Sequence, residues 1–292
     1  TTLLAVPNFS EGRDRASIDA IGAAFGSRPL NVHFDPDHHR TVFTLAGRPG
    51  ELAPVVVAGA RRALELIDVT GHEGAHPRVG AIDVAPIVYL DDADRGAATA
   101  EALVLADMLG EQLRLPVFLY GDLAGGRTRA ELRRGGLAAL AQRIANGEQR
   151  PDFGPRDLHR TAGAVLVTAR PPLVAFNVEL APPATLEDAR EIAALIREGG
   201  AEGLSSVRAI GIWLAHRGIA QVSTNVEDHR HTALADVVEA VRRHATVTRA
   251  ELVGLAPTAA FERFPDDVPV DNKRLIEEAL TTVPDTHQCS TP

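Results

Sequence analysis

A glycine-rich segment places two histidines, His72 and His76, in the pattern H-E-x-x-H. On a helix this spacing brings both imidazoles to one face, where they bind zinc, and the glutamate acts as general base. Gly74 lies inside the segment and Pro77 follows it, and both residues oppose an α-helix. A loop histidine that titrates near neutral pH suits general acid–base chemistry instead. The segment therefore suits a proton-transferring histidine, and a loop histidine with one structural hydrogen bond explains it equally simply. We keep a zinc hydrolase built on His72, Glu73 and His76 as the alternative.

A second polar segment, residues 35–40, carries two carboxylates and two imidazoles between two expected strands. Such a set can bind a metal, or one carboxylate can orient a catalytic histidine. Asp and Pro are also ordinary turn residues, so a solvated turn explains the same composition.

Three further segments could bind a ligand. Asn8 leaves the first strand just before a capped turn, where backbone N–H groups at a helix start attract anions. Small residues from Ala162 to Ala164 let a flat ligand approach the backbone, and Arg170 could face a carboxylate. Ser223 and Asn225 alternate along a later strand, so one of its faces is polar. A capped turn, a buried strand and a solvated face are the simpler explanations.

Composition excludes several classes of protein. The chain has 292 residues and a net charge of −9, which argues against a nucleic-acid partner. Of its 30 basic residues only Lys273 is a lysine, and Cys289 is its only cysteine. We therefore expect neither Schiff-base chemistry nor a disulfide framework, and a reducing cytoplasm fits best. No apolar run reaches the roughly 18 residues that a membrane span needs.

The elements that must position these residues occur in the order β-α-β-β-α-β, and this order occurs twice. The first set is expected at residues 3–9, a helix capped by Ser10 or Asp14, 30–34, 41–46, 51–67 and 83–90. Between residues 95 and 146 we expect two more helices separated by a strand at 115–120. Another strand is expected at 164–168. The second set is expected at 173–180, a helix capped by Thr185, 207–214, 219–225, a helix capped by Thr232, and 251–255. The pattern predicts an α/β fold of two tandem ferredoxin-like subdomains, residues 1–171 and 172–282, with a flexible tail at 283–292.

Five stretches in order together resemble the formiminotransferase domain, which occurs in glutamate formimidoyltransferases and in formiminotransferase-cyclodeaminases. They are Val6 to Gly12, Arg40 to Thr44, His76 to Val84, Ala175 to Val178 and Ala220 to Asn225. The resemblance covers about residues 3 to 260. It implies two ferredoxin-like subdomains with a ligand groove between them, and usually a homodimer.

The resemblance also implies a reaction. Family members move the formimino group of N-formimino-L-glutamate to N5 of tetrahydrofolate, which is a co-substrate, and no metal takes part. The products are L-glutamate and 5-formiminotetrahydrofolate, in histidine degradation and one-carbon metabolism. Because both substrates carry carboxylates, arginine side chains have a natural role in binding them.

The family's catalytic histidine falls on His76, and Asp35 or Asp37 is expected to orient it. The expected folate- or substrate-binding residues are Asn8, Arg40, Arg78, Ala162, Gly163, Ala164, Val165, Thr168, Arg170, Ser223 and Asn225. The chain departs from the family pattern at Asn31 and His33, where acidic residues are usual, and at Thr168, where glycine is usual. A different formimino or formyl donor or acceptor, or a folate-binding protein without catalysis, therefore stays open.

Overall fold

The computed structural model describes residues 1–74 and 76–282, which form two sheets in two compact units. The first unit comprises Thr1–Pro172 and Ile212–Ile219, and the second comprises the other described residues. The tail predicted at 283–292, with Cys289, lies outside the described residues. No helix in the described part of the chain is long and apolar enough to cross a membrane.

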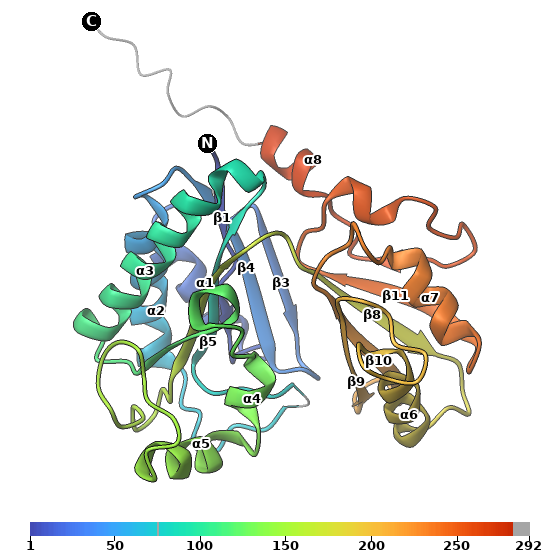
Figure 1. Cartoon of the computed structure of the whole chain (residues 1–292), viewed down its shortest axis with the longest axis horizontal. Coiled ribbons are helices and arrows are strands. Elements are labelled where there is room, and N and C mark those ends of the chain that lie inside the picture. Colours follow the sequence, from blue (N-terminus) through green and yellow to red (C-terminus); the bar gives the residue numbers. More distant parts are fainter. Residues whose placement is uncertain (75, 283–292) are drawn as a thin grey trace, which may run out of the picture. The chain divides into compact units, whose positions relative to one another are not determined.

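The first unit contains a β-α-β-β-α-β set and a C-terminal extension (Figure 1). The set consists of β1 (Leu3–Ala5), β2 (Asn8–Phe9), α1 (Arg15–Ala24), β3 (Asn31–Asp35), β4 (Arg40–Gly47), α2 (Leu52–Leu66) and β5 (Ile82–Tyr89). The extension consists of α3 (Arg95–Gln112), β6 (Val117–Leu119), α4 (Arg129–Arg133), α5 (Gly136–Ala145) and β7 (Val165–Arg170), with short 3₁₀ turns at Asp92–Asp94 and Gly121–Ala124.

The strand predicted over residues 3–9 is two short strands, β1 and β2, because Pro7 has no N–H to donate. Both strands pair with β4 on one side and β5 on the other, so together they fill one position in the sheet. The strand β3 pairs with β4, while β7 and β6 continue the sheet beyond β5 as parallel strands.

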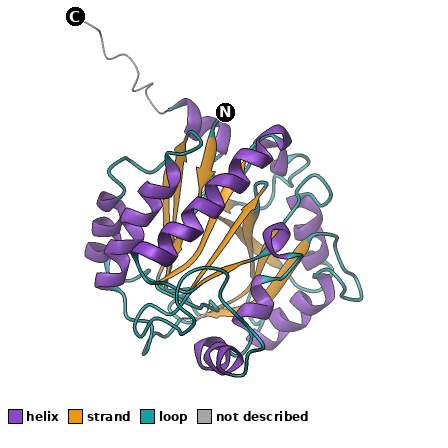
Figure 2. Cartoon of the chain, turned by 60° about the vertical axis from the view of Figure 1, so that its left-hand side comes forward, coloured by secondary structure: helices purple, strands orange, loops and turns teal. Residues whose placement is uncertain are grey.

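Helices cover both faces of the first sheet (Figure 2). Ile21 of α1, Val56 of α2 and Leu105 of α3 lie in one buried cluster with Phe9. On the other face, Leu132 of α4 packs with side chains of β5 and β7. Burying one apolar stripe of each helix in this way is the main source of helix stability.

The single helix predicted between the strand at 115–120 and residue 146 is wrong, because the structure has two helices, α4 and α5, in its place. Thr128 caps α4 in a reciprocal pair with Glu131. The chain then turns at Gly135 and Gly136, both of which have a left-handed backbone with φ of 76° and 73°. Glycine adopts that conformation without steric cost, so the turn interrupts the apolar periodicity.

The second unit repeats the β-α-β-β-α-β order. Its elements are β8 (Val174–Leu180), α6 (Leu186–Ile196), β9 (Val207–Leu214), β10 (Ile219–Val226), α7 (Leu234–Arg242), β11 (Val247–Val253), a 3₁₀ turn at Thr258–Phe261, β12 (Val270–Asp271) and α8 (Ile276–Thr281). The sheet order is β12-β11-β8-β10-β9. The prediction of a mixed α/β fold with two tandem modules of this order is confirmed.

Of the two helix caps predicted in the second unit, one is confirmed. Thr185 caps α6 and forms a reciprocal pair with Asp188. The cap predicted at Thr232 is wrong, because its hydroxyl donates to the carbonyl of Ser205. The helix α7 begins one residue later, and the Asp236 carboxylate accepts the N–H of Ala233.

Candidate active site

A β-bulge lies at the start of β5, beside the motif that carries His76. Asn8 pairs with Val84 and Phe9 pairs with Ile82, so Asp83 is an extra residue without a partner in β2. Bulges bend a strand and redirect a side chain, and they are frequent next to active sites. Here the bulge places the Asp83 carboxylate in the interior with no exposed surface.

Two guanidinium groups hold the Asp83 carboxylate. Its Oδ2 accepts from Nη1 of Arg40 at 2.7 Å and from Nη2 of Arg133 on α4. Its Oδ1 accepts the N–H of Val79 at 2.7 Å. Burial raises the pKa of Asp83, but Arg133 and Arg40 outweigh burial and lower it below the ordinary value. One carboxylate against two guanidiniums leaves one positive charge, which favours an anionic ligand.

Arg40 connects this pair of charges to His76. Its Nε donates to Oδ1 of Asn8 at 2.9 Å, and its Nη1 lies 3.2 Å from Nδ1 of His76. A guanidinium has only donors, so Nδ1 must accept, and the neutral ring carries its proton on Nε2. Burial, then Arg40 and Arg133, lower the pKa of His76 well below 6.5, so the ring is neutral. Three predicted site residues, Asn8, Arg40 and His76, are therefore in one network.

Arg78 shapes the loop that holds His76. Its Nη1 donates to the carbonyl of His72 at 3.2 Å, and its Nη2 donates to the carbonyl of His76 at 2.8 Å. The loop also contacts the turn between β3 and β4, because a Cβ at Gly74 would lie 2.9 Å from the carbonyl oxygen of His38. Glycine at position 74 permits that approach.

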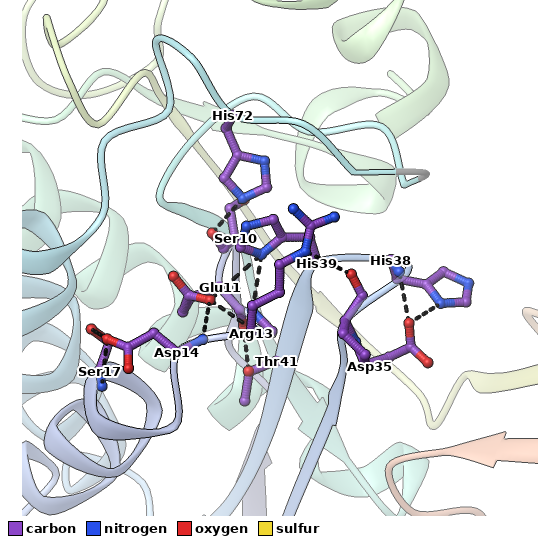
Figure 3. Close-up of polar contacts among 12 residues, drawn as sticks. Ser10, Glu11, Arg13, Asp14, Ser17, Asp35, His38, His39, Thr41 and His72 are labelled. Carbon is purple, nitrogen blue, oxygen red and sulfur yellow. Dashed lines mark hydrogen bonds and ion pairs between the residues drawn. The ribbon is translucent and has the colours of Figure 1, made fainter. Parts of the chain in front are cut away.

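The geometry of His72 and His76 differs from that of a helical zinc site. The described residues of the motif have no regular helix. Nε2 of His72 donates to the carbonyl of Ser10 at 2.7 Å, whereas Nδ1 of His76 accepts from Arg40 (Figure 3 shows the first contact). Within residues 1–74 and 76–282, no three histidine, cysteine, aspartate or glutamate side chains form a group that could hold a metal ion.

The two carboxylates expected to orient His76 are bonded to other histidines. Oδ1 of Asp35 accepts the backbone N–H of His38 at 2.7 Å and its ring Nδ1–H at 2.8 Å (Figure 3). Asp37 accepts the backbone N–H of His216, at 3.0 Å, and lies 2.6 Å from its ring, in the same unit. Burial raises the pKa of Asp35, but the hydrogen bonds from His38 outweigh it, and the pKa falls below the ordinary value.

Two further imidazoles stack in the neighbouring turn. The ring centroids of His39 and His72 are 4.0 Å apart (Figure 3). Nδ1 of His39 accepts the N–H of Gly12 at 3.1 Å. Burial, followed by the charge of His72, lowers the pKa of His39 from 6.5 to about 4, so both rings stay neutral near pH 7.

The small residues at 162–164 bring the backbone of this stretch against the segment between His76 and β5. The N–H of Ala81 donates to the carbonyl of Ala162 at 2.9 Å, and the N–H of Ala164 donates to Val79 at 2.8 Å. Gly163 has a φ of +68°, and a Cβ there would clash with the carbonyl oxygen of Val79. In this structure the group that approaches the small residues is therefore protein backbone.

The remaining residues of the expected folate stretch are largely buried. Val165 lies in the main core of the first unit. The Thr168 hydroxyl donates to the carbonyl of Tyr120 at 2.7 Å, and Nη1 of Arg170 donates to the carbonyl of Pro171 at 2.9 Å.

The other two departures from the family pattern lie on β3. Asn31 is buried. His33 is mostly buried, and this burial lowers its pKa from 6.5 to about 4. Neither position can therefore supply the negative charge that an acidic residue would place there.

Ser223 and Asn225 belong to β10 in the second unit. Ser223 pairs with Asn177 and Asn225 pairs with Ala175 of the antiparallel strand β8. Asn177 donates from Nδ2 to Glu251 on β11, at 3.2 Å, so polar side chains continue across this sheet.

Sequence reasoning missed Asp83 and Arg133 as site residues, and it weighed His38 only as part of a polar turn. Asp83 had a detectable signal, because it is the only charged residue in the apolar strand from Ile82 to Tyr89. Arg133 had none, since it is one of many arginines and lies 50 residues from its partner.

Comparison with known proteins identifies the family. The model of the formiminotransferase domain, N-terminal subdomain, matches residues 2–170, and that of the formiminotransferase domain matches residues 175–272. Glutamate formimidoyltransferases of Streptococcus pyogenes serotype M1 and Thermoplasma acidophilum are 36% and 35% identical, over 88% of this chain and 89% and 88% of their own lengths. The formimidoyltransferase-cyclodeaminase of Rattus norvegicus is 38% identical over 88% of this chain, which spans about half of that protein. The chain belongs to the formiminotransferase family.

Proposed function

We propose that this chain transfers a formimino group from N-formimino-L-glutamate to N5 of tetrahydrofolate, releasing L-glutamate and 5-formiminotetrahydrofolate. Two relatives that this chain covers almost completely carry the name glutamate formimidoyltransferase, which supports the proposal. The observation that carries it is the neutral His76 bonded to Arg40, beside a buried site with an excess positive charge. Both substrates are anions, and neither half of the reaction needs a covalent intermediate.

The reaction moves one proton between two nitrogens. N5 attacks the formimino carbon and must lose a proton, while the glutamate nitrogen must gain one before it leaves. We assign His76 to this general acid–base role. Because Nδ1 accepts from Arg40, the atom that meets the reacting nitrogens is Nε2. In the resting neutral ring that atom carries a proton and can only donate, so His76 accepts the N5 proton at Nε2 only in the other neutral tautomer, with the ring proton on Nδ1 and the Arg40 bond released.

Three of the remaining predicted residues are assigned to positioning, and the others to binding. We propose that Arg40 positions His76, that Asn8 holds Arg40, and that Arg78 holds the His76 loop, because these groups are hydrogen bonded in that way. Ala162, Gly163, Ala164, Val165, Thr168, Arg170, Ser223 and Asn225 stay proposed folate- or substrate-binding residues. Tetrahydrofolate acts as co-substrate, and the proton transfers as written require no metal.

An assay of formiminoglutamate consumption with tetrahydrofolate tests the proposal. We expect turnover by the wild-type chain, unchanged by chelators, and a loss of about 10²–10⁴-fold in kcat for His76→Ala. Absence of turnover by folded wild-type protein would overturn the activity. A wild-type rate in the folded variant would overturn the role of His76. Activity that disappears with stoichiometric bound zinc would support the zinc hydrolase instead.

A related function keeps this mechanism but uses another formimino or formyl donor or acceptor. The Thr168 side chain is buried, at a position where the family usually has glycine, and this difference favours a different donor or acceptor. Competition between formiminoglutamate and alternative donors, compared in wild type and Thr168→Gly, distinguishes the two.

Three further proposals concern the whole molecule. A cytoplasmic location is supported by the single cysteine. A homodimer is supported by the resemblance alone, and sedimentation measurements test it. The subdomain limits 1–171 and 172–282 are supported by the two family matches, which meet between residues 170 and 175.

A further inference from the structure

His38 presents a feature that the proposed reaction has not used. Its ring is buried, and Nε2 has no hydrogen-bond partner among residues 1–74 and 76–282. Nδ1 lies 2.8 Å from Oδ1 of Asp35, a carboxylate that can only accept, so Nδ1 carries the proton. Nε2 therefore holds a free lone pair. A buried polar atom without a partner calls for an explanation, and a ligand that arrives later supplies one.

Asp35 fixes the His38 ring from two directions. The same Oδ1 also accepts the backbone N–H of His38 at 2.7 Å, so backbone and side chain are held together. A carboxylate on one ring nitrogen sets the tautomer and makes the opposite nitrogen a proton acceptor, as in the Asp-His pairs of hydrolases. The low pKa of Asp35 keeps that carboxylate charged near neutral pH.

His38 and His76 are in complementary states. Nδ1 of His76 accepts from Arg40, so His76 offers a donor at Nε2, whereas His38 offers an acceptor at Nε2. The segments that carry the two rings are in contact, because a Cβ at Gly74 in the His76 loop would lie 2.9 Å from the carbonyl oxygen of His38. A positive charge on His38 would lower the pKa of His76, so the two rings are within electrostatic reach of each other.

The other imidazoles of this region fit the acceptor role less well. Nδ1 of His72 is also buried without a hydrogen-bond partner in the described part of the chain, but its opposite nitrogen faces a neutral carbonyl. His39 uses Nδ1 to accept from a backbone N–H. Asp35 and His33 on β3, and His76 on the loop, interact electrostatically with His38.

We propose that His38, oriented by Asp35, is a second catalytic histidine that accepts the proton of the attacking nitrogen. This inference rests on the proposed function and moves the proton transfer from His76, whose Nε2 donates in the resting ring, to His38. As the bond from N5 to the formimino carbon forms, the N5 proton passes to Nε2 of His38. His76 donates a hydrogen bond from Nε2 to the glutamate nitrogen. As the carbon–nitrogen bond to glutamate breaks, His38 returns the proton to that nitrogen, and both rings end as they began.

Steady-state kinetics of wild type, His38→Gln, Asp35→Asn and His231→Gln test this role. His231 is a matched control, because it forms the same i,i+3 pair with Asp228 at 2.9 Å but is exposed. We expect His38→Gln to lower kcat by about 10²–10⁴-fold with little change in KM, and His231→Gln to keep the wild-type rate. A rate within threefold of wild type for folded His38→Gln overturns the inference.

Asp35→Asn gives a measurement that a structural role would not affect. Removing the negative charge weakens the acceptor that holds the ring proton on Nδ1, while the amide oxygen still accepts the backbone N–H of His38, so kcat should fall with little change in KM. An unchanged kcat in folded Asp35→Asn overturns the inference, and this measurement decides the case if His38→Gln fails to fold. Wild-type protein that does not turn over formiminoglutamate overturns the proposed function itself, which is a separate result.

Ring ¹⁵N chemical shifts of the wild-type protein provide a readout without catalysis. We expect the His38 proton on Nδ1 and an unprotonated Nε2, and the reverse arrangement for His76. A His38 ring protonated on Nε2 in the neutral state would contradict the inference.

Discussion

Replacing Asp83 with asparagine gives the most direct test of the buried charge arrangement. An asparagine side chain keeps an oxygen for the N–H of Val79, but its NH₂ group then faces the donors of Arg40 and Arg133. Two guanidiniums would be left buried without a carboxylate. Breaking a buried ion pair in this way costs about 3–5 kcal/mol.

That cost is large enough to measure by thermal unfolding. For a unit of this size, 1 kcal/mol corresponds to about 2–4 °C in Tm, so Asp83→Asn should melt about 6–20 °C lower than wild type. In this variant Arg40 loses the Asp83 carboxylate that holds it. Because Arg40 also bonds to His76, we expect kcat to fall as well. Differential scanning calorimetry and the formimino-transfer assay measure the two effects.

Asp122→Asn is the matched control for this experiment. Asp122 also pairs with an arginine, Arg95, at 2.7 Å, but both side chains are more than half exposed. An exposed pair contributes about 0–1 kcal/mol, so this variant should melt within a few degrees of wild type. Equal melting temperatures for the two variants would refute our account of Asp83.

A second substitution distinguishes lost charge from lost packing. Arg133→Met leaves the neutral pair of Asp83 and Arg40 and should destabilise less than Asp83→Asn. In the Asp83→Asn background the same change removes one unpaired charge, so its effect should be less destabilising by about 0.5–3 kcal/mol. Strictly additive effects would show that these side chains do not interact.

Three further outcomes are expected. Gly163→Ala should destabilise the chain clearly more than Gly126→Ala, because both glycines have positive φ but only Gly163 faces a backbone carbonyl where Cβ would lie; equal Tm losses would contradict this. The His39 pKa is lowered to about 4. Between pH 6.5 and 4 the unfolded state therefore binds more protons than the folded state, and the free energy of unfolding falls as the pH falls. His39→Asn should remove about 1–2 kcal/mol of this loss, a value reduced because the ring is partly solvated. Urea titrations of both proteins at pH 7 and at pH 5 measure the difference. Chelators should leave the wild-type rate unchanged, and a loss restored by zinc would contradict the proposed mechanism.

Sequence periodicity was sufficient for the order of elements because most helices and strands here bury one regular face. Local backbone chemistry set the limits of the prediction. Pro7 divides the first strand, and Gly135 and Gly136 divide one periodic segment into α4 and α5. In both cases the apolar spacing continues across a break that only the missing N–H or the positive φ reveals.

Single residues of the candidate site were predictable from short stretches of sequence, and the contacts that the fold makes between distant segments were not. Asn8, Arg40 and His76 each lie in a stretch that resembles the family, but their contacts with one another span more than 30 residues. The contact of Arg133 with Asp83 spans 50 residues and follows no spacing rule. The proton positions on His38 and His76 depend on which group faces each ring nitrogen, and only the folded chain determines that.

The long separation between Asp83 and Arg133 also has a consequence for biosynthesis. Arg40 precedes the carboxylate in the chain, so Asp83 can pair with one guanidinium as soon as β4 and β5 are made. Arg133 follows 50 residues later, about 3–10 s at ordinary rates of translation. Until α4 is made, Asp83 has one guanidinium partner, and the excess positive charge that suits an anionic substrate arises only when α4 docks.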